Sequence, residues 1–306
     1  MSPISNPVLL PGSRVLVTGV SGFLGSHIAD QLLAGGYLVT GTTRDASKAA
    51  WVQRLFDSKY GERKFEIVEV PDIGFAGAFD KLLDGISGIV HAASDLTMDP
   101  NPEKVITPMV TGVLNMLNAA AQQPSIKRFV LTSSCTAAAS QKPGVGQTID
   151  ANTWNDEVSR EAWAPPPYGP ERGFAVYAAS KMEMEREAWK WHAEHKPHFV
   201  LNTDFFVDVQ DSARLHFAAL THPGVQSERI FAYSAPFTWR GVQRAVQRLY
   251  PDKSFPRDIE EAELDTSVIV PAPRAEALLK DMGRPGWTIL DETARMNTED
   301  LASGAD

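Results

Sequence analysis

The sequence predicts an α/β fold in which a doubly wound parallel sheet is followed by a smaller mixed lobe. Short apolar runs alternate with longer helical patterns over residues 14–202, and most runs are apolar on both faces. Such runs suit parallel strands that helices cover on each side. Alternation of strand and helix along the chain indicates the doubly wound arrangement.

The strands expected in this sheet are the β-rich runs at 14–18, 37–43, 64–70, 87–93, 128–134 and 198–202. Helical patterns at 23–34, 47–60, 102–122 and 176–194 separate them, and Gly35 and Gly61 follow the first two. Residues 141–174 are rich in Pro and Gly and are expected to form a long loop that acts as a lid or wall. After residue 203 the sequence predicts helices at 212–221, 238–250, 275–282 and 291–301 and a strand at 229–233. The expected domains are therefore 1–202 and 203–306.

The composition excludes several classes of protein. The 306 residues include 29 basic and 38 acidic side chains, and no basic run offers a footprint for nucleic acid or an anionic membrane. The single cysteine, Cys135, excludes an internal disulfide and a multi-cysteine zinc site, and no metal site is expected. The first residues do not have the pattern of a signal peptide and no apolar run reaches roughly 18 residues, so we expect neither a signal peptide nor a membrane span. We expect a cytoplasmic monomer or homodimer that acts on a small molecule.

A glycine-rich turn follows the first expected strand. In VTGVSGFLGSH, Gly19, Gly22 and Gly25 lie between this strand and the first helix. This spacing permits a tight turn, close approach of the backbone to a pyrophosphate and close packing of helix on strand. The anion then lies at the helix N-terminus. We expect a Rossmann-type dinucleotide site that also includes Phe23 and Leu24, with a purely structural turn as the alternative.

The end of the second strand indicates which dinucleotide binds. An NAD site carries an acidic residue there, about 20 residues past the glycines, for the ribose 2′-hydroxyl. This strand ends in GTTRD, with Arg44 at that position and Lys48 one helical turn later. Two cations suit a 2′-phosphate, so we expect NADP(H) rather than NAD(H). The alternative is that both cations are solvated and that Asp45 caps the helix or binds the ribose.

Tyr177 and Lys181 are candidate catalytic residues. They lie at positions i and i+4 in VYAASK, on one face of an expected helix. A phenol has a pKa of about 10, and Lys181 is expected to lower the pKa of Tyr177 by stabilising its phenolate. Ser133 and Ser134 end the fifth strand, at the sheet edge where doubly wound folds bind ligands. For Ser134 the alternative is a hydroxyl that only caps the next turn.

Four motifs occur in a specific order: TGVSGFLGSH, HAAS at 91–94, LTSS at 131–134 and YAASK at 177–181. Together they resemble the extended short-chain dehydrogenase/reductase family, with most similarity to fungal and yeast carbonyl reductases related to plant dihydroflavonol reductase. The resemblance covers nearly the whole chain and implies a catalytic triad of Ser134, Tyr177 and Lys181. The further cofactor contacts that it implies are Asp72 and Ile73 at the adenine, and Ala92, Ala93 and Ser94 along the path of the cofactor.

The resemblance implies an NADPH-dependent oxidoreductase that reduces a small aldehyde or ketone to an alcohol. An apolar or aromatic substrate is expected, with secondary metabolism as one setting. Tyr177 would donate a proton to the carbonyl oxygen as general acid. Ser134 would bind that oxygen as charge develops, and Lys181 would bind the nicotinamide ribose.

Two other functions stay open. One is a nucleotide-sugar epimerase or dehydratase of the same superfamily, but such enzymes hold a diphosphate with basic groups of the second lobe. Arg214, Arg229 and Arg240 show no obvious cluster for that task. The other is an NADP-binding protein with impaired or no turnover.

The stretch HFVLNTDFFVDVQD supports this last alternative. It contains two runs typical of buried strands, 198–201 and 205–209, joined by only three residues. Parallel neighbours need a crossover of a dozen or more residues, so the second run cannot be the ordinary parallel neighbour of the first. In relatives of the family, a proline-containing turn and a segment of the substrate pocket follow the sixth strand. We therefore expect that a segment is missing near 202/203.

Overall fold

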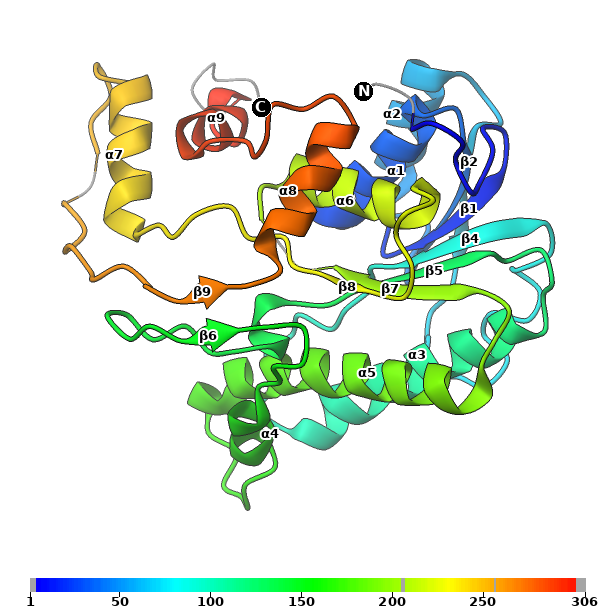
Figure 1. Ribbon diagram of the computed structural model, residues 1–306, viewed down its shortest axis with the longest axis horizontal. Helices are drawn as coiled ribbons and strands as arrows, with labels where there is room; N and C mark the ends of the chain where they lie inside the picture. Colours follow the sequence, from blue (N-terminus) through cyan, green and yellow to red (C-terminus); the bar gives the residue numbers. More distant parts are fainter. Residues whose placement is uncertain (1–3, 205–206, 256, 301–306) are drawn as a thin grey trace.

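A parallel sheet forms the centre of the computed structural model, which describes residues 4–204, 207–255 and 257–300 (Figure 1). Within this part of the chain the sheet has seven strands in the order β3-β2-β1-β4-β5-β7-β8, and each neighbouring pair is parallel. The predicted doubly wound parallel sheet is confirmed. The strands are β1 Arg14–Thr18, β2 Leu38–Thr43, β3 Phe65–Glu69, β4 Ile86–His91, β5 Arg128–Thr132, β7 Val200–Asp204 and β8 Arg229–Ile230.

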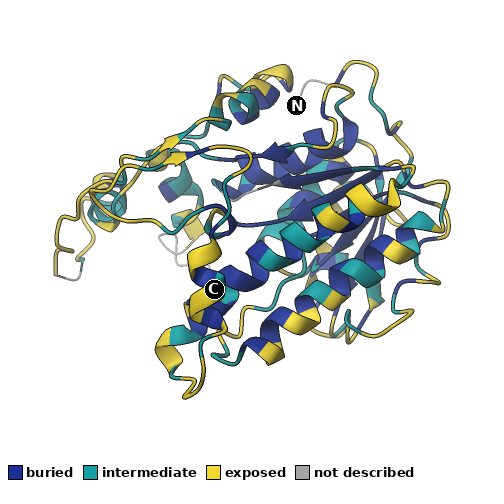
Figure 2. Ribbon diagram, turned by 60° about the horizontal axis from the view of Figure 1, so that its bottom comes forward, coloured by how far each residue is buried: buried dark blue, intermediate teal, exposed yellow. Residues whose placement is uncertain are grey.

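Helices cover both faces of the sheet (Figure 1). One face carries α1 Phe23–Ala34, α2 Ala50–Tyr60 and α6 Val209–Thr221, and the other carries α3 Pro102–Ala121 and α5 Gly173–His195. Ile28 of α1 and Leu215 of α6 belong to one apolar core, and Met116 of α3 and Met184 of α5 to a second. Figure 2 shows buried strands between helices whose outer faces are exposed. Apolar side chains fill the spaces between the sheet and its helices, so we look for the functional side chains at the edges of the sheet.

Local sequence determines where several helices begin and end. Asn101 precedes α3, and its side chain accepts a hydrogen bond from the N–H of Glu103. Pro102 occupies the first helical position, where its missing N–H costs nothing. α1 ends at Ala34 with Gly35 as its C-cap, and Gly36 follows with a φ of +84° that favours glycine.

The segment 141–174 is not one long loop, and this prediction was wrong in part. It contains β6 Thr148–Ile149, α4 Asp156–Ala162 and the short 3-10 helix η2 Pro170–Arg172. Val158 and Ala162 are buried one helical turn apart, and α4 packs against α5. Docking of this apolar stripe stabilises a helix too short to form alone.

The expected strand at 205–209 is wrong where the structure describes it. Val209 begins α6, and the side chain of Asp208 accepts hydrogen bonds from the N–H groups of Gln210 and Asp211. This N-cap ends the extended backbone before a strand can form. Residues 205 and 206 lie outside the described residues. α6 supplies the crossover that β7 needs, because the parallel neighbour of β7 is β8.

The chain after α6 contributes to the sheet and then builds a less regular outer part (Figure 1). α7 Trp239–Leu249, α8 Ala272–Asp281 and α9 Leu290–Met296 lie close to the expected helices, although the end expected at 301 lies outside the described residues. β8 is shorter than the expected strand at 229–233. β9 Val268–Ile269 pairs with β6 and so joins the outer part to the segment 141–174. None of the described helices is long and apolar enough to cross a membrane.

Candidate active site

The candidate active site lies at the carboxyl edge of the sheet. The strand order reverses between β1 and β4, and β5 ends beside β4. Ligands of doubly wound sheets bind in the crevice at this reversal. The glycine turn follows β1, and the short 3-10 helix η1 Cys135–Ala137 follows β5.

The glycine turn forms a cradle that side chains would fill. Gly19 has a φ of +69°, and a Cβ on it would lie 2.9 Å from Cα of Ala93. A Cβ on Gly25 would lie 2.2 Å from the carbonyl oxygen of Gly19. Gly22 precedes α1, and none of the described side chains caps the first-turn N–H groups, which include those of Phe23 and Leu24. The residues present therefore fit the pyrophosphate of a dinucleotide.

The end of β2 presents two exposed cations. Arg44 forms no ion pair with any described residue, and Lys48 is 84% exposed, with Nζ 3.8 Å from the Asp45 carboxylate. Asp45 accepts hydrogen bonds from the Ser47 hydroxyl and from the N–H groups of Ser47 and Lys48, and these bonds lower its pKa. Asp45 thus holds the turn after β2 and does not cap α2, which begins at Ala50 without a side-chain cap, and both cations can still meet a phosphate.

The residues expected beside the adenine follow β3. Asp72 accepts a hydrogen bond from the N–H of Gly74, at 2.8 Å. Ile73 packs on Gly112 of α3, where an added Cβ would lie 3.0 Å from the Ile73 side chain. Close packing on a glycine fixes the backbone of this turn.

The residues expected along the path of the cofactor follow β4. The N–H of Ala93 donates to the Thr18 hydroxyl at 3.0 Å, which ties this turn, including Ala92, to β1. The Ser94 hydroxyl is buried and has no hydrogen-bond partner among the described residues. A buried polar atom without a partner is costly, so this hydroxyl fits a contact with a bound polar group.

His91 lies in the core rather than at the surface of the site. Its Nδ1 pairs with the Thr18 hydroxyl at 2.9 Å, and its side chain is fully buried. Burial, aided by the nearby Lys181, lowers the pKa of His91 to about 3. The ring is therefore neutral at physiological pH and serves packing.

The structure brings the hydroxyl groups of Ser134 and Tyr177 together. Burial raises the pKa of Tyr177, and a hydrogen bond with the Ser134 side chain offsets part of the rise. The Ser134 hydroxyl also accepts from the N–H and hydroxyl of Thr136, so it caps η1 as the structural alternative held. Ser134 can cap η1 and contact the Tyr177 hydroxyl at the same time, because its hydroxyl has two lone pairs and one proton.

Lys181 lies one turn after Tyr177 on α5 and is almost fully buried. Its ammonium donates to the carbonyl of Thr132 at 3.1 Å. Burial lowers the pKa of Lys181 to about 8, and the carboxylate of Glu185 opposes this shift. The expected lowering of the Tyr177 pKa by Lys181 is not found: burial dominates, and the Tyr177 pKa lies above its ordinary value. At neutral pH Tyr177 keeps its proton.

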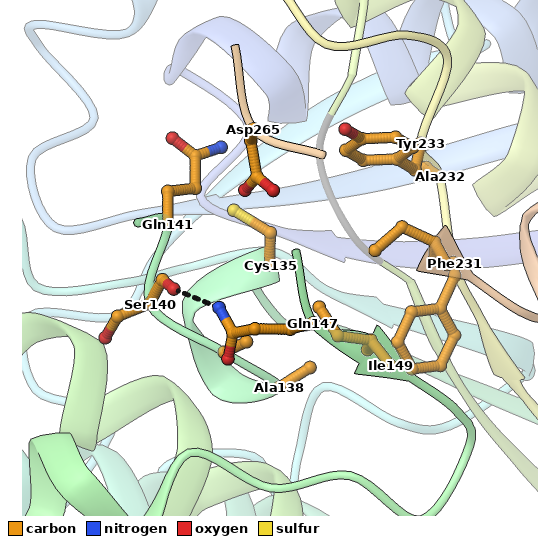
Figure 3. Close-up of a pocket in the computed structure, with 12 residues that line it drawn as sticks. Cys135, Ala138, Ser140, Gln141, Gln147, Ile149, Phe231, Ala232, Tyr233 and Asp265 are labelled. Atoms are coloured by element: carbon orange, nitrogen blue, oxygen red, sulfur yellow. Dashed lines mark hydrogen bonds between the residues drawn. The ribbon is translucent and has the colours of Figure 1, made fainter. Parts of the chain in front are cut away.

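A small hollow of about 40 Å³, open to solvent, lies beside η1 (Figure 3). It is lined by Cys135, Ala138, Ala139, Ser140, Gln141, Gln147, Ile149, Phe231, Ala232, Tyr233, Asp265 and Ile269. Cys135 directly follows Ser134, and Phe231 directly follows β8. The hollow is therefore placed to receive the part of a ligand that extends beyond Ser134.

Sequence reasoning missed two residues of this region. Glu185 lies one turn after Lys181, is fully buried, and accepts hydrogen bonds from the hydroxyls of Ser133 and Thr203. Its spacing from Lys181 was a usable signal, because residues four apart share a helix face. Asp265, far along the chain, gave no signal that it would line the hollow.

A parallel sheet with a glycine cradle after β1 and a serine, tyrosine and lysine beyond β5 defines a dinucleotide-dependent enzyme fold. The chain belongs to the NAD dependent epimerase/dehydratase family, whose model matches residues 15–203. This confirms the resemblance to extended short-chain dehydrogenases/reductases.

Several named reductases are similar to this chain over nearly its whole length. Aldehyde reductase 2 of Sporidiobolus salmonicolor is 37% identical over 337 aligned residues, which cover 96% of this chain and 98% of that protein. Ketoreductase adrE of Penicillium rubens is 36% identical, with 95% and 97% covered. Gre2 of Candida albicans, solved in complex with NADPH, has the same fold, with a TM-score of 0.81 at 22% identity and with 96% and 99% covered.

Proposed function

We propose that this protein is an NADPH-dependent reductase of small aldehydes or ketones. The observation that carries the proposal is the contact between Ser134 and Tyr177 beside a hollow that is mainly apolar, with Lys181 one turn away. The similar aldehyde reductase and ketoreductases support it. The product would be the corresponding alcohol.

The residues of the site divide the chemistry among them. NADPH, when bound, supplies the hydride that reduces the carbonyl carbon. Tyr177, which keeps its proton at neutral pH, donates that proton to the carbonyl oxygen. The Ser134 hydroxyl holds the same oxygen as negative charge develops on it. Lys181 presents a buried ammonium one helical turn after Tyr177, and this ammonium can hold a ribose hydroxyl of the cofactor.

NADPH rather than NADH is proposed because Arg44 and Lys48 stand exposed at the end of β2. No acidic residue occupies the position of Arg44, where an NAD site places its ribose ligand. A guanidinium can form two parallel hydrogen bonds to a phosphate. The NADPH complex of the Gre2 neighbour agrees with this choice.

The composition of the hollow speaks against a nucleotide-sugar epimerase or dehydratase. Such a substrate carries a diphosphate, which calls for basic groups nearby. Among the described residues that line the hollow, none is Lys or Arg, and Asp265 is acidic. A nucleotide diphosphate would therefore meet a carboxylate instead of a cation.

Purified protein tests the proposal directly. Loss of NADPH absorbance is followed with aromatic aldehydes and β-keto esters, and with nucleotide sugars in parallel. We expect consumption with the carbonyl compounds, and faster consumption with NADPH than with NADH. Turnover of a nucleotide sugar alone would overturn the proposal.

One feature favours a second candidate, an NADP-binding protein with poor turnover. β7 ends at Asp204 and α6 begins at Val209, which leaves no room for the pocket segment expected there. The alignment with the aldehyde reductase runs over 337 residues, although this chain has only 306. We propose that the chain lacks a segment its relatives carry, and that the residues after β8 form a reduced substrate lobe; the expected boundary at 202/203 falls inside β7, and α6 and β8 belong to the sheet domain.

A further inference from the structure

The hollow beside Ser134 has one acidic side chain, Asp265, in a mainly apolar wall. Figure 3 shows the carboxylate of Asp265 on the same side as Cys135 and Tyr233. The Gln147 amide, by contrast, is engaged by the carbonyl of Ser140 at 3.0 Å. Asp265 therefore presents the only formal charge among the described residues of this wall.

The wall of the hollow connects Asp265 with Cys135, the residue after Ser134. Burial, and then the charges of Asp265 and Cys135, raise the pKa of Tyr233. Cys135 acts on the pKa of Tyr177 as well. Cys135 directly follows Ser134 and lines the hollow together with Tyr233 and Asp265, so a molecule held at Ser134 can extend past Cys135 toward Asp265.

The backbone around Asp265 is anchored. The N–H of Ser267 donates to one carboxylate oxygen of Asp265 at 2.8 Å, and the Ser267 hydroxyl accepts from the N–H of Gln147 at 3.1 Å. The next residues form β9, which pairs with β6. No lysine or arginine of the described chain forms an ion pair with Asp265. Its charge therefore acts on whatever enters the hollow.

We infer that Asp265 is a specificity-determining residue: it makes the hollow favour carbonyl substrates whose distal end carries a cation or a hydrogen-bond donor, and reject substrates whose distal end is a carboxylate. Ile149, Phe231 and Ile269 contact the apolar body of such a substrate. A carboxylate in this position would lose water and face a like charge, whereas a cation or donor would be paired. This inference rests on the proposed function, because the reacting carbonyl must lie at Tyr177.

Matched aldehydes test this selectivity in the NADPH-loaded protein. Benzaldehyde is compared with its para-carboxy and para-trimethylammonio derivatives, and kcat/KM is measured for each. We expect the cationic aldehyde to exceed the anionic one by about tenfold or more, a difference of about 1.4 kcal/mol. Asp265→Asn should bring the two kcat/KM values within about twofold of each other, because the charge of Asp265 is the source of the tenfold difference. Glu263→Gln, which removes an equal charge two residues away, should leave the ratio unchanged.

A binding measurement separates failure of the inference from failure of the proposed function. If no aldehyde oxidises NADPH, the proposed function fails while the inference is still tested by calorimetry. Benzyltrimethylammonium should then bind the NADPH-loaded protein more tightly than benzoate, and Asp265→Asn should abolish the difference. Equal binding of the two ions, or a preference that survives Asp265→Asn, overturns the inference.

Discussion

Arg229 donates from Nε to a carboxylate oxygen of Glu185 at 2.8 Å, and both side chains are buried, at 6% and 0% exposure. Glu185 belongs to the catalytic helix α5, and Arg229 begins β8. The guanidinium also donates to the carbonyls of Ala151 and Thr153 and lies 4.0 Å from the ring centre of Trp154. One buried pair thus fixes α5, β8 and the segment before α4 to one another.

Removal of one member of this pair should destabilise the protein strongly. Glu185→Gln leaves the Arg229 charge buried without its carboxylate, which costs about 3–5 kcal/mol. Replacement of both residues by Met should recover part of that loss, because no unpaired buried charge remains, while the Ser133 and Thr203 hydroxyls still lose their acceptor. Urea unfolding measures the free energy of unfolding of the native protein, of Glu185→Gln and of the double Met variant.

An exposed ion pair provides the matched control. Arg186 of α5 pairs with Asp156 of α4, and these side chains are 40% and 65% exposed. Asp156→Asn should change the free energy of unfolding by less than about 1 kcal/mol. If Glu185→Gln proves no more harmful than Asp156→Asn, the importance assigned to the buried pair is wrong.

Tyr177→Phe should abolish proton donation while the cofactor stays bound. General acid catalysis contributes about 10²- to 10⁴-fold, so kcat should fall by that factor. The Kd for NADPH should change little, because the glycine cradle and Arg44 are untouched. Steady-state kinetics and fluorescence titration measure the two effects.

Tyr168→Phe, at an exposed tyrosine beside Arg172, is the control and should retain full activity. A Tyr177→Phe protein with near-native kcat would exclude Tyr177 as the acid.

Arg44→Ala should weaken NADPH binding and spare NADH. A hydrogen bond to a charged group contributes about 1.5–3 kcal/mol, which corresponds to roughly a 10- to 100-fold increase in Kd. NADH lacks the 2′-phosphate, so its Kd should stay the same. Arg54→Ala removes an exposed arginine of α2 and should affect neither cofactor. Equal weakening of both cofactors by Arg44→Ala would contradict a role in phosphate recognition.

How far the sequence predicts this structure depends on the range of the interaction involved. α1 was predicted at its observed bounds, because the glycine turn and Gly35 are local signals. The strand expected at 205–209 was wrong over the described residues 207–209, because Asp208 caps α6 and Val209 begins that helix. An apolar run can begin a buried helix as well as a strand.

Contacts between distant segments escaped sequence reasoning altogether. The pairing of Glu185 with Arg229 joins residues 44 positions apart. Asp265 reaches the hollow only because β9 pairs with β6. No periodicity or motif encodes such neighbours, which depend on how the whole chain packs.

Lys181 should make stability depend on pH in the alkaline range. Its pKa is about 8 in the folded protein, against an ordinary value of 10.5. Between these values the unfolded chain binds a proton that the folded protein has released, so folding stability rises with pH across this window. Below about pH 8 the buried ammonium costs about 3 kcal/mol.

Lys181→Met removes that ammonium. The variant should therefore gain stability over the native protein near pH 7, and the gain should shrink as the pH approaches about 10.5. Urea unfolding near pH 7 and near pH 10.5 measures this gain in the free energy of unfolding. Lys104→Met, at a lysine whose side chain is 67% exposed, should show no such trend. A gain that is the same at both pH values would mean that Lys181 is not a buried charge.

The short connection from β7 to α6 should limit turnover but not cofactor binding. The glycine cradle and Arg44 precede Ser134 in the chain, so an insertion after Asp204 leaves these residues unchanged. The position of the substrate is expected to depend on the residues after Asp204. Misplacement by about 1 Å can cost on the order of a hundredfold in rate.

Insertion of the corresponding segment of the aldehyde reductase between Asp204 and Val207 should therefore raise kcat/KM for aromatic aldehydes and leave the Kd for NADPH unchanged. A glycine-serine linker of equal length is the control and should not raise kcat/KM. Equal turnover by the native chain and the chimaera would show that the chain lacks nothing it needs.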